Sequence, residues 1–188
     1  MNEAQLINSA REGNTAAWET LVSIYQEPVF RLAYLLLGDP DEAQDAAQET
    51  FIRAWYALSR FDTSLPPRPW LLRITSNIAK NRLRSLGRFF TALTRFGREP
   101  VISNPEPDDS DLLWQAIRRL DGDHQRALYL RYFMDMPEAE MSQVLNIAPG
   151  TVKSRLHRAQ KALREIITRD YPDLQPGFDS DPAARGEV

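Results

Sequence analysis

Apolar residues recur at every third or fourth position along almost the whole chain, the spacing that gathers them on one face of an α-helix. No alternation of apolar and polar residues is long enough to indicate a β-strand, so the chain is expected to be all-α. The pattern predicts a first helix from Leu6 to about Tyr25 and a second from about Pro28 to Leu37. Gly38 follows at the position of a C-terminal cap, where a left-handed residue ends many helices.

Capping residues mark the start of a third helix. Asp39 suits the N-cap, and Pro40 suits the first helical position because its missing amide would have no partner there. Glu42, three residues after the cap, completes the pattern of a capping box. This helix is expected to run to about Leu58.

Proline-rich segments indicate the loops and the domain boundary. Residues 61–69 contain three prolines, which fix φ and remove amide donors, so a shaped loop is expected before a fourth helix from about Trp70 to Leu86. Residues 99–111 hold five acids, three prolines and no base, which is typical of an extended linker. The expected division is a helical domain over residues 1–87, a flexible acidic linker over 88–111, a second small helical domain over 112–170 and a disordered tail over 171–188.

The second domain is expected to end in a helix-turn-helix. Two short helices, from about Pro137 to Leu145 and from about Pro149 to Ile167, are separated by three residues that begin with Asn146. Asn146 tolerates the left-handed conformation that such a turn requires. On the second helix, the core-facing positions are expected to be Val152, Leu156, Ala159 and Leu163.

The net charge of −3 hides two basic segments. Residues 60–98 carry nine bases against one acid, and residues 141–165 carry five bases against one acid. The arrangement of charge governs binding more than its total does, so the net negative charge does not exclude a nucleic-acid partner.

The exposed face of the last helix is basic and rich in hydrogen-bond donors, as a major-groove helix should be. Any charged helix has such a face, but the short helix and tight turn before it favour DNA binding. The residues expected on this face are Thr151, Lys153, Ser154, Arg155, His157 and Arg158.

The fourth helix carries a narrower stripe of polar and basic residues, at Arg73, Asn77, Lys80 and Arg84. These positions lie within about 60° of one another around a helix, so they can follow a phosphate backbone. Phe61 and Trp70 beside the stripe are aromatic platforms on which an unstacked base could lie. Trp70 taken alone is more simply interpreted as a core residue, and the stripe as a solvated face.

The third helix has an acidic and amide-rich outer face, formed by Asp45, Gln48, Glu49 and Ile52. DNA would be repelled by this face, so a protein partner with a basic surface fits it better. An ordinary solvated face is the alternative.

No enzyme site, metal site or cofactor site emerges from the sequence. There are no cysteines, and His124 and His157 have no metal-ligand companion at helical spacing. The N-terminal residues lack the basic start and apolar run of a signal peptide, and no stretch approaches the roughly 18 apolar residues of a membrane span. The protein is expected to act in the cytoplasm without membrane insertion.

Three stretches together resemble the signature regions of the extracytoplasmic-function (ECF) group of bacterial sigma factors. They are DEAQDAAQETFIRAWYALSRFD (41–62), PWLLRITSNIAKNRLR (69–84) and GTVKSRLHRAQKALRE (150–165), in the same order and with similar spacing. Ala148 departs from the family, which usually has Ser or Thr at the N-cap of the last helix, and it loses a cap worth about 1 kcal/mol.

The resemblance implies a partner for each surface. Asp45, Gln48, Glu49 and Ile52 occupy positions that bind the clamp of the largest subunit of core RNA polymerase. The 61–69 loop and the following helix, with Asn77 at the matching position, would open the minus-10 promoter element and hold a flipped base. Lys153, Ser154, Arg155, His157 and Arg158 would recognise the minus-35 element, and an anti-sigma factor would be a further partner.

Two other classes of protein remain as alternatives. A conventional helix-turn-helix regulator would bind duplex DNA without polymerase, and an adaptor would bind proteins alone. The stripe beside an aromatic loop separates the first alternative from a sigma factor, because a duplex-binding regulator has no use for single-strand contacts.

Overall fold

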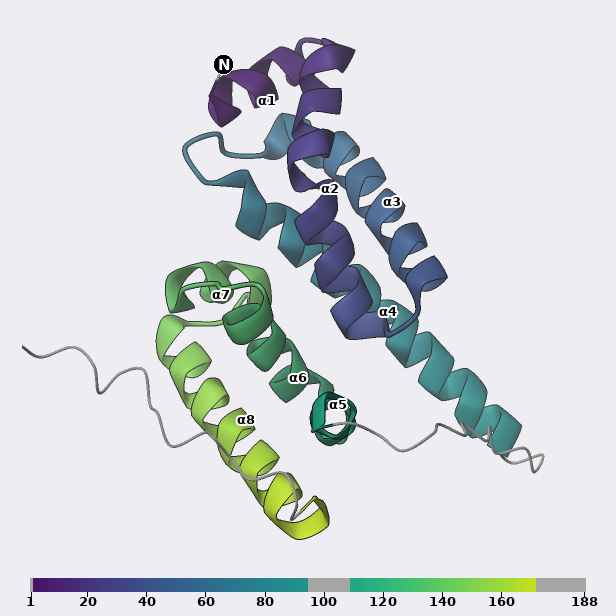
Figure 1. Cartoon of the computed structure of the whole chain (residues 1–188). Helices are drawn as coiled ribbons and strands as arrows, with labels where there is room; N and C mark the ends of the chain where they lie inside the picture. The colour runs from purple at the N-terminus through teal and green to yellow at the C-terminus, as the bar shows by residue number, and fades with distance from the viewer. Residues whose placement is uncertain (1, 95–108, 172–188) are drawn as a thin grey trace, which may run out of the picture.

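The computed structural model describes residues 2–94 and 109–171, and all the regular elements in these ranges are helices. The all-α prediction is confirmed. Helices α1 to α4 form one bundle and α5 to α8 a second, smaller one (Figure 1). None of the helices in the described ranges combines the length and the apolar character needed to cross a membrane.

The first predicted helix is in fact two helices, α1 (Glu3–Arg11) and the start of α2 (Thr15–Leu37). Gly13, with φ of +92°, turns the chain between them, and the Asn14 side chain caps α2 by accepting from the amide of Ala17.

The predicted helix start at Pro28 is wrong, because α2 continues through this proline. Proline inside a helix removes one hydrogen bond and costs about 3 kcal/mol. The flanking turns offset that cost by burying Val29 and Leu32, which are 0% and 1% exposed. Ile24, whose carbonyl would have received the missing bond, lies on the exposed side of the helix.

The cap predictions between α2 and α3 (Pro40–Ala57) are largely confirmed. Gly38 adopts a φ of +74° and ends α2, and Asp39 Oδ1 accepts from the amide of Glu42 at 2.9 Å. The Glu42 side chain does not complete a capping box, because it pairs with Arg82 of α4 instead. A 3₁₀ turn, η1 (Leu58–Arg60), follows α3.

Helix α4 (Pro67–Thr94) is longer at both ends than predicted. It begins three residues before Trp70, because the first turn of a helix tolerates prolines, here Pro67 and Pro69. It also extends past residue 87, where the first domain was expected to end. Residues 95–108 of the predicted linker and residues 172–188 of the predicted tail lie outside the described residues, whereas linker residues 109–111 belong to a helix that begins at Asp109.

The second bundle contains the predicted helix-turn-helix. Its elements are α5 (Asp109–Arg118), α6 (Gly122–Leu128), the π-helical turn η2 (Tyr129–Phe133), α7 (Glu138–Leu145) and α8 (Pro149–Asp170). Asn146 has the expected left-handed conformation, with φ of +55°. The turn is closed by Ser142 Oγ, which donates to the carbonyl of Ile147 at 2.7 Å.

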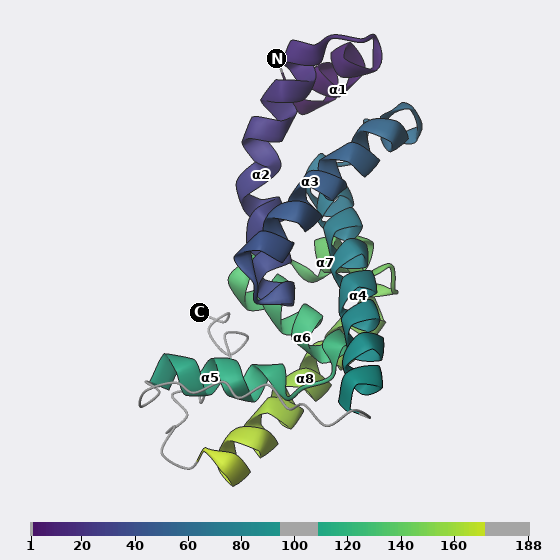
Figure 2. The ribbon, with the colours of Figure 1, turned by 90° about the vertical axis from the view of Figure 1, so that its right-hand side faces the viewer.

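The two bundles contact each other along α4. Helix α7 lies against it, as both ribbon views show (Figures 1 and 2). Arg68 of α4 donates to the carbonyl of Met134 at 2.6 Å, and Arg126 of α6 donates to Ser76 Oγ at 3.5 Å. The sequence predicted a tether between independent domains and did not predict this contact.

Candidate nucleic-acid and polymerase interfaces

The outer face of α3 is oriented as predicted. Asp45 and Gln48 are exposed, and Ile52 leaves 57% of its surface exposed although it is apolar. Alanines on the opposite side of the helix are buried against the neighbouring helices. The partner of this face is not visible in an isolated chain, so its role stays a prediction.

Glu49 differs from its neighbours because Arg82 of α4 binds it. Arg82 places Nη2 3.2 Å from Glu49 Oε2 and Nη1 2.7 Å from Glu42 Oε2. Burial alone would lower the pKa of Arg82, but the hydrogen bonds and charges of the two glutamates outweigh it and raise the pKa. This bridge explains an arginine at an apolar position of α4, and it gives Glu49 a structural role in joining α3 to α4.

Sequence reasoning missed two apolar features beside this face. A surface hollow of about 500 Å³ lies between α2 and α3, lined in part by Phe30, Gln48 and Phe51. Tyr56, one turn beyond Ile52, is 80% exposed. The i, i+4 spacing of Ile52 and Tyr56 was the available signal, because it places both side chains on one face of a helix.

Phe61 is not the exposed platform that the sequence predicted. It is only 8% exposed, and its ring centroid lies 4.5 Å from that of Trp70, which is itself half-buried. Burial of these two rings closes the corner between η1 and α4, where an exposed phenylalanine would forfeit its apolar contacts. The core interpretation of Trp70 therefore describes both residues better.

The predicted stripe on α4 is divided by the second bundle. Arg73, Asn77 and Arg84 are exposed. Lys80 is half-buried, with Nζ 3.8 Å from Asp123 Oδ1 of α6. The charge of the nearby Arg126, followed by burial, lowers the pKa of Lys80.

Helix α8 has the predicted orientation. Its apolar residues Val152, Leu156, Ala159 and Leu163 are buried. The opposite side exposes Lys153, Ser154, His157 and Arg158, while Thr151 is half-buried. The division between core face and solvent face is confirmed, and the DNA contacts themselves stay a prediction.

The start of α8 has no side-chain cap, as the alanine at position 148 requires. The amide of Thr151 bonds to the carbonyl of Ala148 at 2.9 Å, which tightens the first turn. One turn later, Ser154 Oγ donates to the Thr151 carbonyl at 3.1 Å, and Arg158 Nε donates to the Ser154 carbonyl at 3.2 Å. The donors of this face are thus partly held against their own helix.

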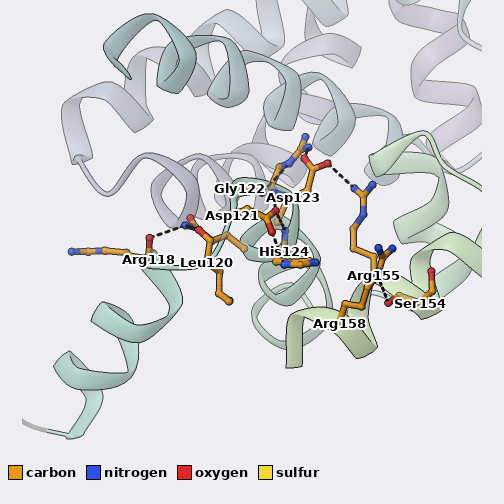
Figure 3. A network of polar contacts seen from close by, with 11 residues as sticks. Arg118, Leu120, Asp121, Gly122, Asp123, His124, Ser154, Arg155 and Arg158 are labelled. Carbon is orange, nitrogen blue, oxygen red and sulfur yellow. Dashed lines mark hydrogen bonds and ion pairs between the residues drawn. The ribbon is translucent and has the colours of Figure 1, made fainter. Parts of the chain in front are cut away.

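Arg155 is turned away from the exposed face. Its side chain is 17% exposed, and its Nη1 lies 3.3 Å from Asp123 Oδ2. Figure 3 shows the Arg155 side chain directed toward Asp123. Asp123 also binds Arg126 and Lys80. Burial works to raise the pKa of Asp123, but the hydrogen bond from Arg126 and the surrounding cations outweigh it and lower the pKa. One carboxylate therefore contacts two residues that were expected to contact DNA, Lys80 and Arg155.

The two bundles correspond to two known protein families. Residues 21–89 match the family model of sigma-70 region 2, and residues 110–163 match that of sigma-70 region 4. The ECF RNA polymerase sigma factor SigW of Bacillus subtilis is 31% identical over 177 residues, covering 86% of this chain and 94% of that protein. SigL of Mycobacterium tuberculosis is 30% identical over 165 residues, covering 84% of this chain and 93% of that protein.

Solved structures give the same fold. The structure of CnrH in complex with the cytosolic domain of CnrY matches with a TM-score of 0.67 at 25% identity, covering 89% of this chain and 98% of that one. The sigma factor RpoE of Bartonella quintana was solved with the anti-sigma factor NepR. It matches with a TM-score of 0.64 at 24% identity, covering 81% of this chain and 97% of that one.

A conventional helix-turn-helix regulator does not account for these matches. Region 4 alone would fit such a regulator, but the region 2 match includes α3 and the stripe residues of α4. Full-length similarity to SigW and SigL includes both bundles. The chain therefore belongs to the ECF RNA polymerase sigma factors, which direct the polymerase to start transcription at promoters.

Proposed function

We propose that this sigma factor divides its work among three surfaces. The outer face of α3 holds it on core RNA polymerase, the start of α4 and the loop before it hold the opened minus-10 element, and α8 recognises the minus-35 element as duplex. The residues proposed for core polymerase are Asp45, Gln48, Glu49 and Ile52. Those for the minus-10 element are Arg73, Asn77, Lys80 and Arg84. Those for the minus-35 element are Thr151, Lys153, Ser154, Arg155, His157 and Arg158.

The polymerase-binding role of α3 is supported by its mixture of charge and exposed apolar surface. Carboxylates at Asp45 and Glu49 suit a basic partner and speed its association, while Ile52 and Tyr56 offer apolar area that would be buried on docking. Glu49 keeps its bond to Arg82 in the free protein, so Asp45 is the freer of the two charges. DNA would be repelled here.

The minus-10 role is carried by one observation: Asn77 and Arg73 are exposed side by side on α4, one turn apart. An amide can pair with a base edge and an arginine with a phosphate, so together they suit a strand whose bases are accessible. Extruding a base costs a few kcal/mol of stacking, which such contacts must offset. A protein that binds only duplex through α8 has no use for them.

The minus-35 role of α8 requires a rearrangement at its flank. Lys153, His157 and Arg158 already face outward and can enter a major groove. Arg155 must exchange Asp123 for DNA before it can contribute. Release of the Arg155 side chain from Asp123 would therefore add one cation to the DNA-binding face.

Transcription with purified components tests the proposal. Core polymerase alone should give no promoter-specific product, and adding the protein should give discrete transcripts from fragments of the source genome. Asn77→Ala should reduce those transcripts while leaving binding to core polymerase unchanged. Binding to duplex promoters without polymerase, combined with no change in transcripts, would contradict the proposal.

We further propose that the factor acts in the cytoplasm and adds no catalytic step of its own. We also propose that an anti-sigma protein controls it there. The structurally similar CnrH was solved with the cytosolic domain of another protein bound. The hollow between α2 and α3 and the exposed Tyr56 provide apolar surface for such a partner. Isolation of the native factor with its partner, followed by a transcription assay with and without that partner, tests this.

A further inference from the structure

The loop over residues 62–66 is fastened by a side chain from the N-terminal helix. Arg11, at the end of α1, donates from Nε to the carbonyl of Leu58 at 2.8 Å and from Nη2 to the carbonyl of Phe61. Leu58 begins η1 and Phe61 directly follows it, so both bonds lie at the last turn before the loop. Helix α1 ends before residue 21, where the match to region 2 begins, so the fastening comes from outside the matched segment.

The chemistry of arginine suits this position. Its planar guanidinium presents donors in a fixed fork, so one side chain can bond two carbonyls that diverge at the end of a turn. A third donor, Nη1, bonds to Asn8 Oδ1 at 3.2 Å and fixes the orientation of the fork on α1. Bonds from a charged donor are about twice as strong as neutral ones, so the contact resists fraying of η1.

The rest of the loop is held by its own contacts. Asp62 Oδ1 accepts from the amide of Ser64 at 2.9 Å, and the amide of Leu65 bonds to the Asp62 carbonyl at 3.1 Å. Phe61 and Trp70, on either side of the loop along the chain, pack their rings against each other. The loop is therefore folded before any ligand arrives, and its position relative to α4 depends on where the chain leaves η1.

We propose that Arg11 is a positioning residue for promoter opening: it sets the 62–66 loop where the loop receives the unstacked minus-10 base. The proposal rests on the proposed function, because the role of this loop in holding the base is itself proposed there. Without the Arg11 bonds the loop would sample more conformations. Ordering it again around a captured base would then cost conformational entropy. Helix α1 then belongs to the melting machinery, although it lies before the region 2 match.

The test compares Arg11→Ala and Arg11→Lys in holoenzyme on a promoter with 2-aminopurine in the non-template strand of the minus-10 element. Fluorescence of this base rises when it unstacks. Both variants should lower the opening rate and the preference for the native base about tenfold, because two backbone bonds are lost and lysine keeps the charge without the fork. The matched control is Arg31→Ala, at an exposed arginine of α2, which should behave as wild type.

Three results would overturn the proposal. Wild-type opening by Arg11→Ala would mean that the fastening has no effect, and full rescue by Arg11→Lys would mean that charge alone matters. Equal losses in core-polymerase affinity and in opening would mean general damage to the fold.

An Asn77→Ala variant in the same assay separates this proposal from the proposed function. If Asn77→Ala loses base preference and Arg11→Ala does not, only the role of Arg11 fails. If Asn77→Ala and Leu65→Ala both keep full base preference, the loop and α4 do not hold the base, and the proposed function fails.

Discussion

Reversing the charge of Asp45 should separate polymerase binding from folding. Asp45 is exposed on α3, so Asp45→Lys should change the free energy of unfolding by no more than about 0.5 kcal/mol. Two unit charges 4 Å apart interact by about 1 to 4 kcal/mol between bulk water and a protein surface, and reversal replaces attraction by repulsion. With screening, a net loss of about 2 kcal/mol is expected, which is roughly a thirtyfold rise in Kd for core polymerase.

The assay is fluorescence anisotropy of labelled protein titrated with core polymerase, repeated at two salt concentrations. The matched control is Glu19→Lys, which reverses an exposed charge on α2 in the same bundle. The defect of Asp45→Lys should shrink as salt rises, because exposed charges are screened. Equal affinities for the two variants would refute the assignment of this face.

Glu49→Lys is a poorer probe of the same face, because the structure ties this residue to the fold. It would break the bond to Arg82 and place two cations together where Arg82 is only 24% exposed. A loss of about 1 to 2 kcal/mol in unfolding free energy is expected from that change alone. Any fall in polymerase affinity for this variant must therefore be compared with its stability.

Three further predictions concern DNA binding and the contact between the bundles. If Arg158 makes a bidentate contact to a base, Arg158→Ala should weaken minus-35 binding by about 1 to 3 kcal/mol and relax the preference at that base. Titration of holoenzyme with minus-35 duplexes measures this, and equal weakening on all sequences would indicate a phosphate contact instead. Asn77→Ala should leave minus-35 binding unchanged. It should slow open-complex formation on an intact promoter more than on a template with a pre-melted minus-10 region, and an equal defect on both templates would contradict a role in melting. The pKa of Asp123 is lowered in the folded protein, so its contacts should contribute stability above the unfolded pKa near 3.8 and lose it as the pH falls through the lower folded value. Thermal unfolding from pH 7 to 3 should show this loss in wild type and a smaller one in Asp123→Asn; identical profiles would mean that Asp123 does not stabilise the contact.

The sequence alone determined the features that depend on near neighbours along the chain. The caps at Gly38, Asp39 and Asn146 were predictable, because each depends on local backbone conformation or on a side chain that bonds a nearby amide. The buried and exposed sides of α3 and α8 followed from helical periodicity. The family resemblance came from a different signal, the residues of the three stretches 41–62, 69–84 and 150–165.

Only the tertiary structure decided features that depend on distant partners. Pro28 lies inside a helix because the core packing around it outweighs a local penalty, and no local signal reports that packing. Phe61 is buried because Trp70 lies next to it in space. Arg82 lies at an apolar position of its helix pattern and Arg155 was expected on an exposed face, yet each is held by carboxylates at least 32 residues away along the chain, Glu42, Glu49 and Asp123. Charge pairs of this kind form only when folding brings the helices together, so the sequence could name the charged residues but not which of them are already paired.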